Sequence, residues 1–147
     1  MTWWEDLAHE YPDFTERVRS RFQVRKHGTM ATLRQDGSPR ISGTEFDFSD
    51  EGLHLGSMPN ALKALDLRRD PRLGLHCPTE DAPEEDPASW GGDAKISGIA
   101  HEITGGEGES HRFRIEVTEV VLTKVTATEL VLESWHPGRG IEITRRK

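Results

Sequence analysis

The first 22 residues place apolar side chains at the spacing of a helix. Phe14, Val18 and Phe22 recur at every fourth position and form one apolar stripe, which is the pattern of a helix with one buried face. Two short motifs resemble a capping box, in which an oxygen-bearing side chain precedes a glutamate by three positions: Thr2 with Glu5, and Asp13 with Glu16. The pattern predicts one or two short helices over residues 2–22.

Beyond this segment the period shortens to two residues, which is typical of strands. It is clearest at Phe113, Ile115 and Val117. The dipeptide Asp36-Gly37 separates the first two predicted strands and is a strong hairpin signal. The predicted strands cover residues 27–34, 39–48, 53–57, 72–77, 94–104, 111–125 and 128–135.

A single predicted helix, residues 59–69, interrupts the strands. Pro59 stands near its first position, where the missing N–H costs nothing, and Pro71 ends it. About six to seven antiparallel strands with mostly short connections, short N-terminal helices and one crossover helix predict a mainly β fold, an antiparallel barrel.

The chain shows no repeat and no linker that would divide it. We therefore expect a single domain over residues 1–147, with a helical N-terminal segment at 1–22 and a C-terminal tail at 136–147. Residues 78–92 are acidic and rich in Pro and Gly, which predicts a mobile loop.

The composition narrows the classes of partner and compartment. Apolar residues make up 33% of the chain and charged residues 31%, so the core is thin, which leaves room for a dimer. The net charge of −7 argues against nucleic acid as a partner, because phosphate backbones bind clustered Lys and Arg. The single cysteine, Cys77, excludes an internal disulfide, favours a reducing cytoplasm and is expected to be buried. Neither a signal peptide nor a membrane span is expected.

Histidine spacing gives little support to a metal site. None of the histidines forms an i, i+4 helical pair or repeats at a ligand spacing, so we expect no metal. Three of them, on different predicted strands, have positions that could meet across the sheet: His54, His76 and His101.

The segment that joins a strand to the helix at 59–69 carries the clearest chemistry. Gly56 lets a backbone approach an anion closely, Ser57 adds a hydroxyl donor, and the start of a helix offers unpaired N–H groups. The ammonium group of Lys63 could reach an anion there, because helical side chains lean toward the N-terminus. The alternative is a solvated Lys63 paired with Asp66 or Asp70.

Three sequence blocks, in this order, resemble the pyridoxamine 5'-phosphate oxidase-like split β-barrel family, and more narrowly its flavin/deazaflavin oxidoreductase group. They are HGTMAT at 27–32, DGSPRIS at 36–42 and KALDLRRDPR at 63–72. The resemblance covers roughly residues 20–77 and weakens beyond them.

This resemblance implies a split barrel of six or seven strands that works as a homodimer, with FMN or the deazaflavin coenzyme F420 between subunits. Lys63 matches the basic residue that holds the cofactor phosphate. The other implied contacts are Arg40, Ser42, Gly56, Ser57, Met58, Trp135 and Arg139. Trp135 and Arg139 would lie near a cofactor site, the partner's included. Core packing of Trp135 is an equally open alternative to stacking on the cofactor ring.

The implied function is a flavin- or deazaflavin-dependent oxidoreductase acting on a small molecule, with no catalytic acid or base indicated. FMN and F420 both stay open, since each carries a phosphate and a three-ring system. The chain is too short for the vitamin B6 enzyme itself. Gly43 and Ala61 depart from the family pattern, and the missing basic residue at Ala61 favours the alternative of a non-catalytic flavin- or haem-binding module.

Overall fold

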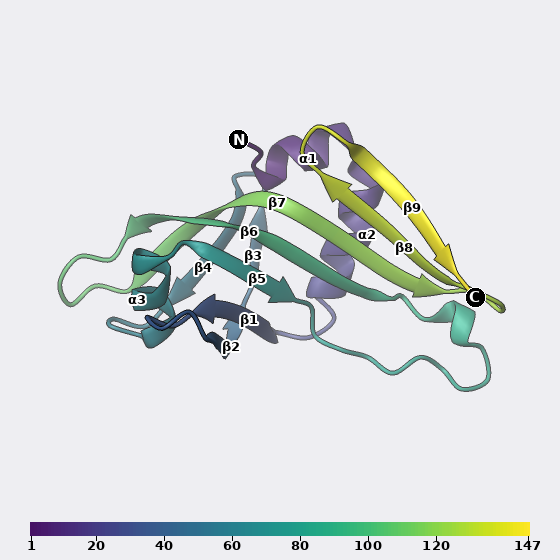
Figure 1. Cartoon of the computed structure of the whole chain (residues 1–147), viewed down its shortest axis with the longest axis horizontal. Helices are drawn as coiled ribbons and strands as arrows, with labels where there is room; N and C mark the ends of the chain where they lie inside the picture. Colours follow the sequence, from purple (N-terminus) through teal and green to yellow (C-terminus); the bar gives the residue numbers. More distant parts are fainter.

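One sheet of nine antiparallel strands dominates the computed structural model, which describes all 147 residues (Figure 1). The strands are β1 (His27–Leu33), β2 (Pro39–Glu45), β3 (Asp47–Ser49), β4 (Gly52–Ser57), β5 (Arg72–His76), β6 (Asp93–Thr104), β7 (His111–Val125), β8 (Leu130–His136) and β9 (Gly140–Arg146). The helices are α1 (Trp4–Glu10), α2 (Pro12–Phe22), α3 (Leu62–Arg69) and the short 3₁₀ helix η1 (Pro87–Ser89).

The sheet curls into a barrel that stays open at one seam. Its strands follow the order β2-β1-β5-β6-β7-β4-β3, and β8 and β9 extend the sheet from β7. Strands β2 and β4 lie close to each other without pairing. The chain breaks direction at Phe46, between β2 and β3, where one strand was predicted over residues 39–48. The predicted split barrel is confirmed, with this seam as the split. It has nine strands where six to seven were predicted, because the predicted strand over 39–48 is two strands and the last strand, β9, was not predicted.

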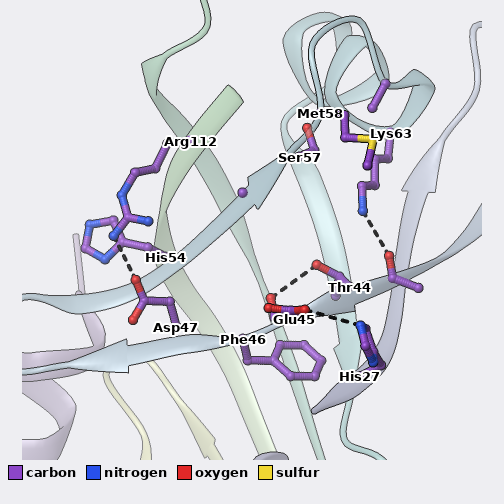
Figure 2. A pocket seen from close by; sticks show the side chains of 13 residues that line it. His27, Thr44, Glu45, Phe46, Asp47, His54, Ser57, Met58, Lys63 and Arg112 are labelled. Carbon is purple, nitrogen blue, oxygen red and sulfur yellow. Dashed lines mark hydrogen bonds and ion pairs between the residues drawn. The ribbon is translucent and has the colours of Figure 1, made fainter. Parts of the chain in front are cut away.

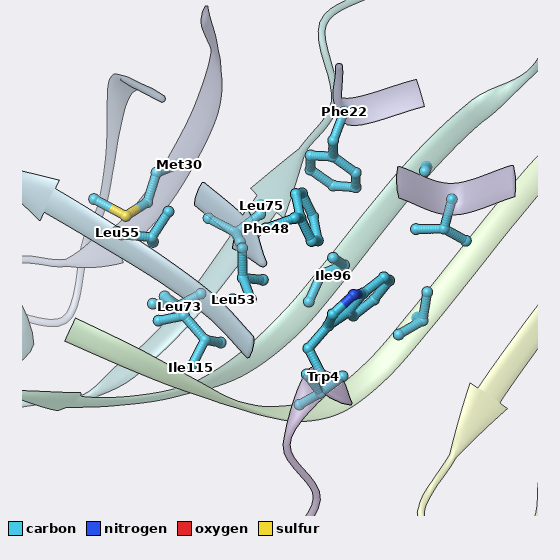
Figure 3. Packing of buried hydrophobic residues seen from close by; sticks show 14 of the residues in the cluster. Trp4, Phe22, Met30, Phe48, Leu53, Leu55, Leu73, Leu75, Ile96 and Ile115 are labelled. Carbon is cyan, nitrogen blue, oxygen red and sulfur yellow. The ribbon is translucent and has the colours of Figure 1, made fainter. Parts of the chain in front are cut away.

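The core fills the inside of the barrel and continues beneath the N-terminal helices. Inward side chains of the strands meet aromatic side chains from α1 and α2, as the cluster in Figure 3 shows. Trp4 packs against Phe48 with ring centroids 5.0 Å apart. Phe22 packs against Phe46 at 4.7 Å. These edge-to-face contacts fasten the helices over one end of the barrel.

The predicted helical segment is confirmed, with starts that differ from the predicted ones. The stripe of Phe14, Val18 and Phe22 is buried. Helix α1 is capped by Trp3, whose N–H donates to the Asp6 carboxylate at 3.1 Å, one position later than the Thr2–Glu5 motif. Helix α2 begins at Pro12, because a proline at the first helical position leaves no donor unpaired.

The C-terminal tail predicted over 136–147 is largely a strand in the structure. Residues Gly140–Arg146 form β9 and pair along their whole length with β8. Charged side chains occupy much of this strand and are exposed, so its apolar positions are too few for the sequence pattern to reveal it. None of the helices combines the length and the apolar character that a membrane-spanning helix needs.

A charged pair joins α2 to β8 beneath this extension. Glu133 is buried, and Arg17 Nη2 donates to its Oε1 at 3.0 Å. The hydrogen bonds from Arg17 lower the pKa of Glu133, and burial opposes them. A carboxyl whose pKa is lowered on folding stabilises the folded state above its unfolded pKa and loses that effect as the pH falls through the folded one.

We expect Glu133→Gln to lower the free energy of unfolding by about 1 kcal/mol at pH 7, as for a partly exposed ion pair. The difference from the wild type should shrink as the pH falls below 4.5, the ordinary pKa of a glutamate. Urea unfolding at pH 7 and pH 3 measures both. A difference that stays constant between the two pH values would contradict the role of the ionised carboxylate.

Candidate functional site

A hollow of about 820 Å³ lies at the seam between β2 and β4 and reaches the start of α3. Figure 2 shows its lining side chains converging from both strands and from the turn before the helix. Four residues of the predicted set line it: Gly56, Ser57, Met58 and Lys63. Ligand pockets of proteins typically have volumes of roughly 300–1,000 Å³, so the hollow can take a cofactor of nucleotide size.

The turn that closes the hollow was predicted to be helix. Helix α3 begins at Leu62, and residues Met58–Ala61 form a turn in which the Ala61 N–H donates to the Met58 carbonyl at 3.2 Å. Asn60 has a φ of 61°, and Pro59 precedes it. A proline followed by a left-handed residue is the signature of a type II turn, which explains why a proline near a helix start did not mark the first residue of this helix.

Lys63 is the second residue of α3 and faces the hollow. Its Nζ donates to the Gly43 carbonyl at 2.9 Å, as Figure 2 shows, and burial lowers its pKa. No carboxylate lies within ion-pair distance of it. Asp66 instead binds Arg40 and Arg69, and Asp70 binds Arg72. The alternative that Lys63 pairs with Asp66 or Asp70 is therefore wrong.

Several further donors around Lys63 have no partner. Ser57 Oγ is buried without a hydrogen bond. The backbone N–H groups of Leu62 and Lys63, in the first turn of α3, donate to no backbone carbonyl. A half-buried ammonium beside unpaired hydroxyl and backbone donors is the donor set that binds a phosphate.

Because Gly56 has no side chain, the hollow stays open between these donors and the wall that faces them. A Cβ built on it would have its nearest neighbour, the His111 carbonyl oxygen, at 3.6 Å, which is ordinary contact. The backbone of β4 therefore does not require glycine here for lack of room. A side chain at this position would occupy the hollow instead.

The opposite wall carries side chains that were not assigned to the site from the sequence. Phe46 gives it an aromatic surface. Arg112 Nη2 donates to the Asp47 carboxylate at 2.8 Å, and His27 Nε2 lies 3.2 Å from Glu45. These residues share no sequence motif. What they have in common is a position near the end of a strand beside the seam, which can be recognised only when the pairing of the strands is known.

His54 forms part of the same wall and is nearly enclosed. Its Nδ1 has no hydrogen-bond partner, and burial and the nearby Arg112 lower its pKa. The imidazole is therefore uncharged at neutral pH. The three histidines on different strands do not gather: His101 binds Glu116, and His76 Nδ1 lies near the Cys77 carbonyl.

Arg40 and Ser42 lie on the inward face of β2, away from the lining of the hollow. Arg40 Nε donates to the buried Asp66 at 2.7 Å, so this side chain joins β2 to α3. Ser42 is half-buried next to Gly43, which does line the hollow. Their direct contact with a cofactor stays a prediction.

Trp135 and Arg139 lie away from this hollow. Trp135 is only 5% exposed and belongs to the core cluster, which supports packing rather than stacking within its own chain. Both residues line a second hollow of about 640 Å³ near α1, where Arg139 is exposed. Cys77 is buried as predicted, and burial raises its pKa.

Solved structures of low sequence identity share this fold. A pyridoxamine 5'-phosphate oxidase-related, FMN binding protein from Nostoc punctiforme is 9% identical, with a TM-score of 0.69 and 97% of each chain covered. HutZ, a heme storage protein from Vibrio cholerae, is 18% identical, with a TM-score of 0.52, 73% of this chain covered and 89% of that one.

ChuZ from Campylobacter jejuni is 14% identical, with a TM-score of 0.62 and 89% of this chain covered. The chain spans 62% of the length of ChuZ. No protein-family model matches the sequence, and no curated protein matches it. At these identities the likeness establishes the fold, and the residues of the hollow must carry any argument about function.

Proposed function

Since this chain has the split β-barrel fold of pyridoxamine 5'-phosphate oxidase-like proteins, we propose that it binds FMN or a deazaflavin in the hollow at its seam and acts as an oxidoreductase. The observation that carries the proposal is Lys63: a half-buried ammonium that lines the hollow and has no carboxylate partner. An anionic ligand is the partner that such a group lacks.

The residues present fit a cofactor phosphate. Lys63, Ser57 Oγ and the first backbone N–H groups of α3 would hold it, and the helix start adds a favourable dipole. Phe46 and Met58 supply apolar surface for a ring system. When bound, such a cofactor supplies hydride or electron transfer, while the protein binds and orients it.

The proposal includes a homodimer whose interface borders the hollow. Large apolar side chains are exposed on β2, on the turn and on α3, the elements around it: Ile41 (76% exposed), Met58 (80%), Leu62 (60%) and Leu65 (36%). Exposed apolar residues grouped on neighbouring elements are typical of interaction sites. In such a dimer the second copy would cover these residues, and its Trp135 and Arg139 could approach the cofactor.

A second candidate function is a non-catalytic haem- or flavin-binding module. Its specific support is that two imidazoles, of His27 and His54, line the hollow, because imidazole is a common haem ligand. The same fold in the heme storage protein HutZ agrees with this candidate.

Titration of the purified full chain with FMN, F420 and haem separates these candidates. We expect saturable quenching of the fluorescence of FMN or F420, and light scattering should show a dimer. Haem binding alone, seen as a shifted absorption band, would favour the second candidate. Absence of binding to FMN and F420 would overturn the proposed function. The bound cofactor can also be reduced and its reoxidation followed. If it is reoxidised only at the rate at which the reduced cofactor reacts with oxygen, a binding module is favoured over an oxidoreductase.

A further inference from the structure

The turn that closes the hollow is held from outside by a histidine. Asn60 is the only non-glycine residue with a positive φ. Its backbone N–H, in the middle of the Met58–Ala61 turn, has no acceptor within the turn and donates to Nε2 of His111 at 3.1 Å. His111, the first residue of β7, is 2% exposed.

The other ring nitrogen of His111 faces a carboxylate. Its Nδ1 lies 3.1 Å from Oε1 of Glu102 on β6. The hydrogen bonds from Arg68 hold the pKa of Glu102 at about 2, so this carboxylate is ionised and can only accept. Arg68 donates two hydrogen bonds to this carboxylate, from Nε to Oε2 at 2.8 Å and from Nη2 to Oε1 at 2.7 Å.

These two partners select one form of the imidazole. An amide N–H can only donate, so Nε2 must offer its lone pair. A carboxylate can only accept, so Nδ1 must carry the hydrogen. Only the neutral ring with its hydrogen on Nδ1 satisfies both, and a second proton on the ring would remove the acceptor that Asn60 needs.

The contacts form a closed chain of residues around the start of α3. Arg68, near the end of that helix, binds Glu102; Glu102 orients His111; and His111 holds Asn60, two residues before the helix begins. His111 also pairs in register with Ser57. The turn joins Ser57, the last residue of β4, to α3, which carries Lys63, so its position sets how these two side chains stand in the hollow.

We infer that His111 is a positioning residue of the cofactor pocket, which holds the turn at Asn60 through its neutral, Nδ1-protonated imidazole. The inference rests on the proposed function, because the pocket it positions is the flavin site. It makes cofactor affinity depend on the protonation of His111.

The charged groups that face the ring come from two elements, Glu102 from β6 and Arg68 from α3. Ser57 of β4 and Asn60 of the turn bring no charge. Arg112 follows His111 in sequence but binds Asp47. The ring is therefore bordered by one carboxylate, which is itself held by one guanidinium.

Two variants of the full chain test the inference through FMN affinity. His111→Leu fills the space without an acceptor, so the turn loses the hydrogen bond that holds it, and we expect FMN binding roughly tenfold weaker at pH 8, about the worth of one hydrogen bond. His111→Gln offers an amide oxygen near the place of Nε2 and should bind FMN within about threefold of the wild type. Circular dichroism and the thermal midpoint show whether each variant is folded.

The pH profile distinguishes positioning from a merely structural role. Between pH 8 and pH 5.5 the affinity of the wild type should fall more steeply than that of His111→Gln. Protonation of the FMN phosphate affects both proteins alike, so the difference between the profiles belongs to the ring. Parallel profiles, or a Leu variant that binds as well as the wild type, would overturn the inference.

Nitrogen-15 NMR of the ligand-free protein provides a readout that needs no cofactor. We expect the Nδ1-protonated tautomer of His111 at pH 8 and a slowly exchanging Asn60 amide that becomes fast in His111→Leu. The opposite tautomer would overturn the inference whatever the affinities. A wild type that shows the expected tautomer but binds no flavin would overturn the proposed function and, with it, the role in a cofactor pocket.

Discussion

Replacing Lys63 by alanine is expected to weaken FMN binding by roughly 10- to 100-fold, the range for loss of a charge-assisted hydrogen bond. The side chain lines the hollow, and its ammonium keeps donors free beyond the one that binds the Gly43 carbonyl at 2.9 Å. It makes no ion pair within the chain, so its removal leaves no carboxylate unpaired. Fluorescence titration at constant ionic strength measures the effect.

Lys95→Ala is the matched control for this experiment. Lys95 is exposed on β6, outside the hollow, and its replacement by alanine removes the same charge from the protein. It should leave the affinity unchanged, whereas Lys63→Arg should restore most of it. Equal losses in the two alanine variants would show a general charge effect and contradict a phosphate site at Lys63.

Gly56→Val tests the same location by volume rather than by charge. The backbone of β4 accepts a Cβ at this position without a close contact, and valine is favourable in a strand. We expect a folded protein with weakened FMN binding. Unchanged affinity in this variant would place the cofactor elsewhere, even if Lys63→Ala behaves as expected.

Asp66→Ala should cost roughly 3–5 kcal/mol of the free energy of unfolding, the usual effect of removing one partner from a buried ion pair. Asp66 is 2% exposed. Its Oδ2 accepts from Thr32 Oγ1 and from Arg40 Nε, each at 2.7 Å, and Oδ1 accepts from Arg69 at 3.0 Å. The variant would leave these donors beneath α3 without their acceptor, as urea unfolding at pH 7 can measure.

The direction of the pKa shift of Asp66 determines how its contribution to the free energy of unfolding depends on pH. Burial acts to raise the pKa of Asp66, but the hydrogen bonds from Arg40, Thr32 and Arg69 prevail and lower it. Its contribution is therefore complete above pH 3.8, the ordinary value for an aspartate, and is lost as the pH falls through the lower folded pKa.

Asp70→Ala is the comparison for Asp66→Ala. Asp70 also binds an arginine, Arg72, with Nη2 and Oδ2 2.7 Å apart, but this pair lies at the surface. We expect only a small change in stability there, because surface ion pairs contribute little. A loss in Asp66→Ala no larger than in Asp70→Ala would show that burial of the network between β2 and α3 does not matter.

Local patterns predicted the parts of the fold that local interactions determine. The stripe of Phe14, Val18 and Phe22 needs only helical spacing, and the Asp36-Gly37 turn needs only two residues. Strand β9 was missed because its exposed charged residues form a strand only by pairing with β8. The helix start was placed too early because Pro59 belongs to a type II turn with the left-handed Asn60, whose N–H donates to His111, 51 positions away.

The lining of the hollow was predicted on one side and not on the other. Gly56, Ser57 and Lys63 lie close in sequence, so a strand followed by a helix was enough to bring them together. His54 and Arg112 come from strands separated by a long stretch of chain and share no motif. Trp135 and Arg139 lie together at the second hollow rather than at the seam, because of the course of β8 and β9, which no short segment determines.

The contacts from Arg68 to Asn60 have a consequence for the order of folding. Asn60 and Arg68 are near neighbours in sequence, yet the residues that connect them lie on the β6–β7 hairpin. Bringing these distant segments together lowers the entropy of the chain before the contacts that offset this loss can form. The N-terminal helices can form early from local interactions, whereas the hollow at the seam can take its shape only after the central hairpin has docked. The proposed ligand site is therefore expected to be among the last parts of this chain to become native.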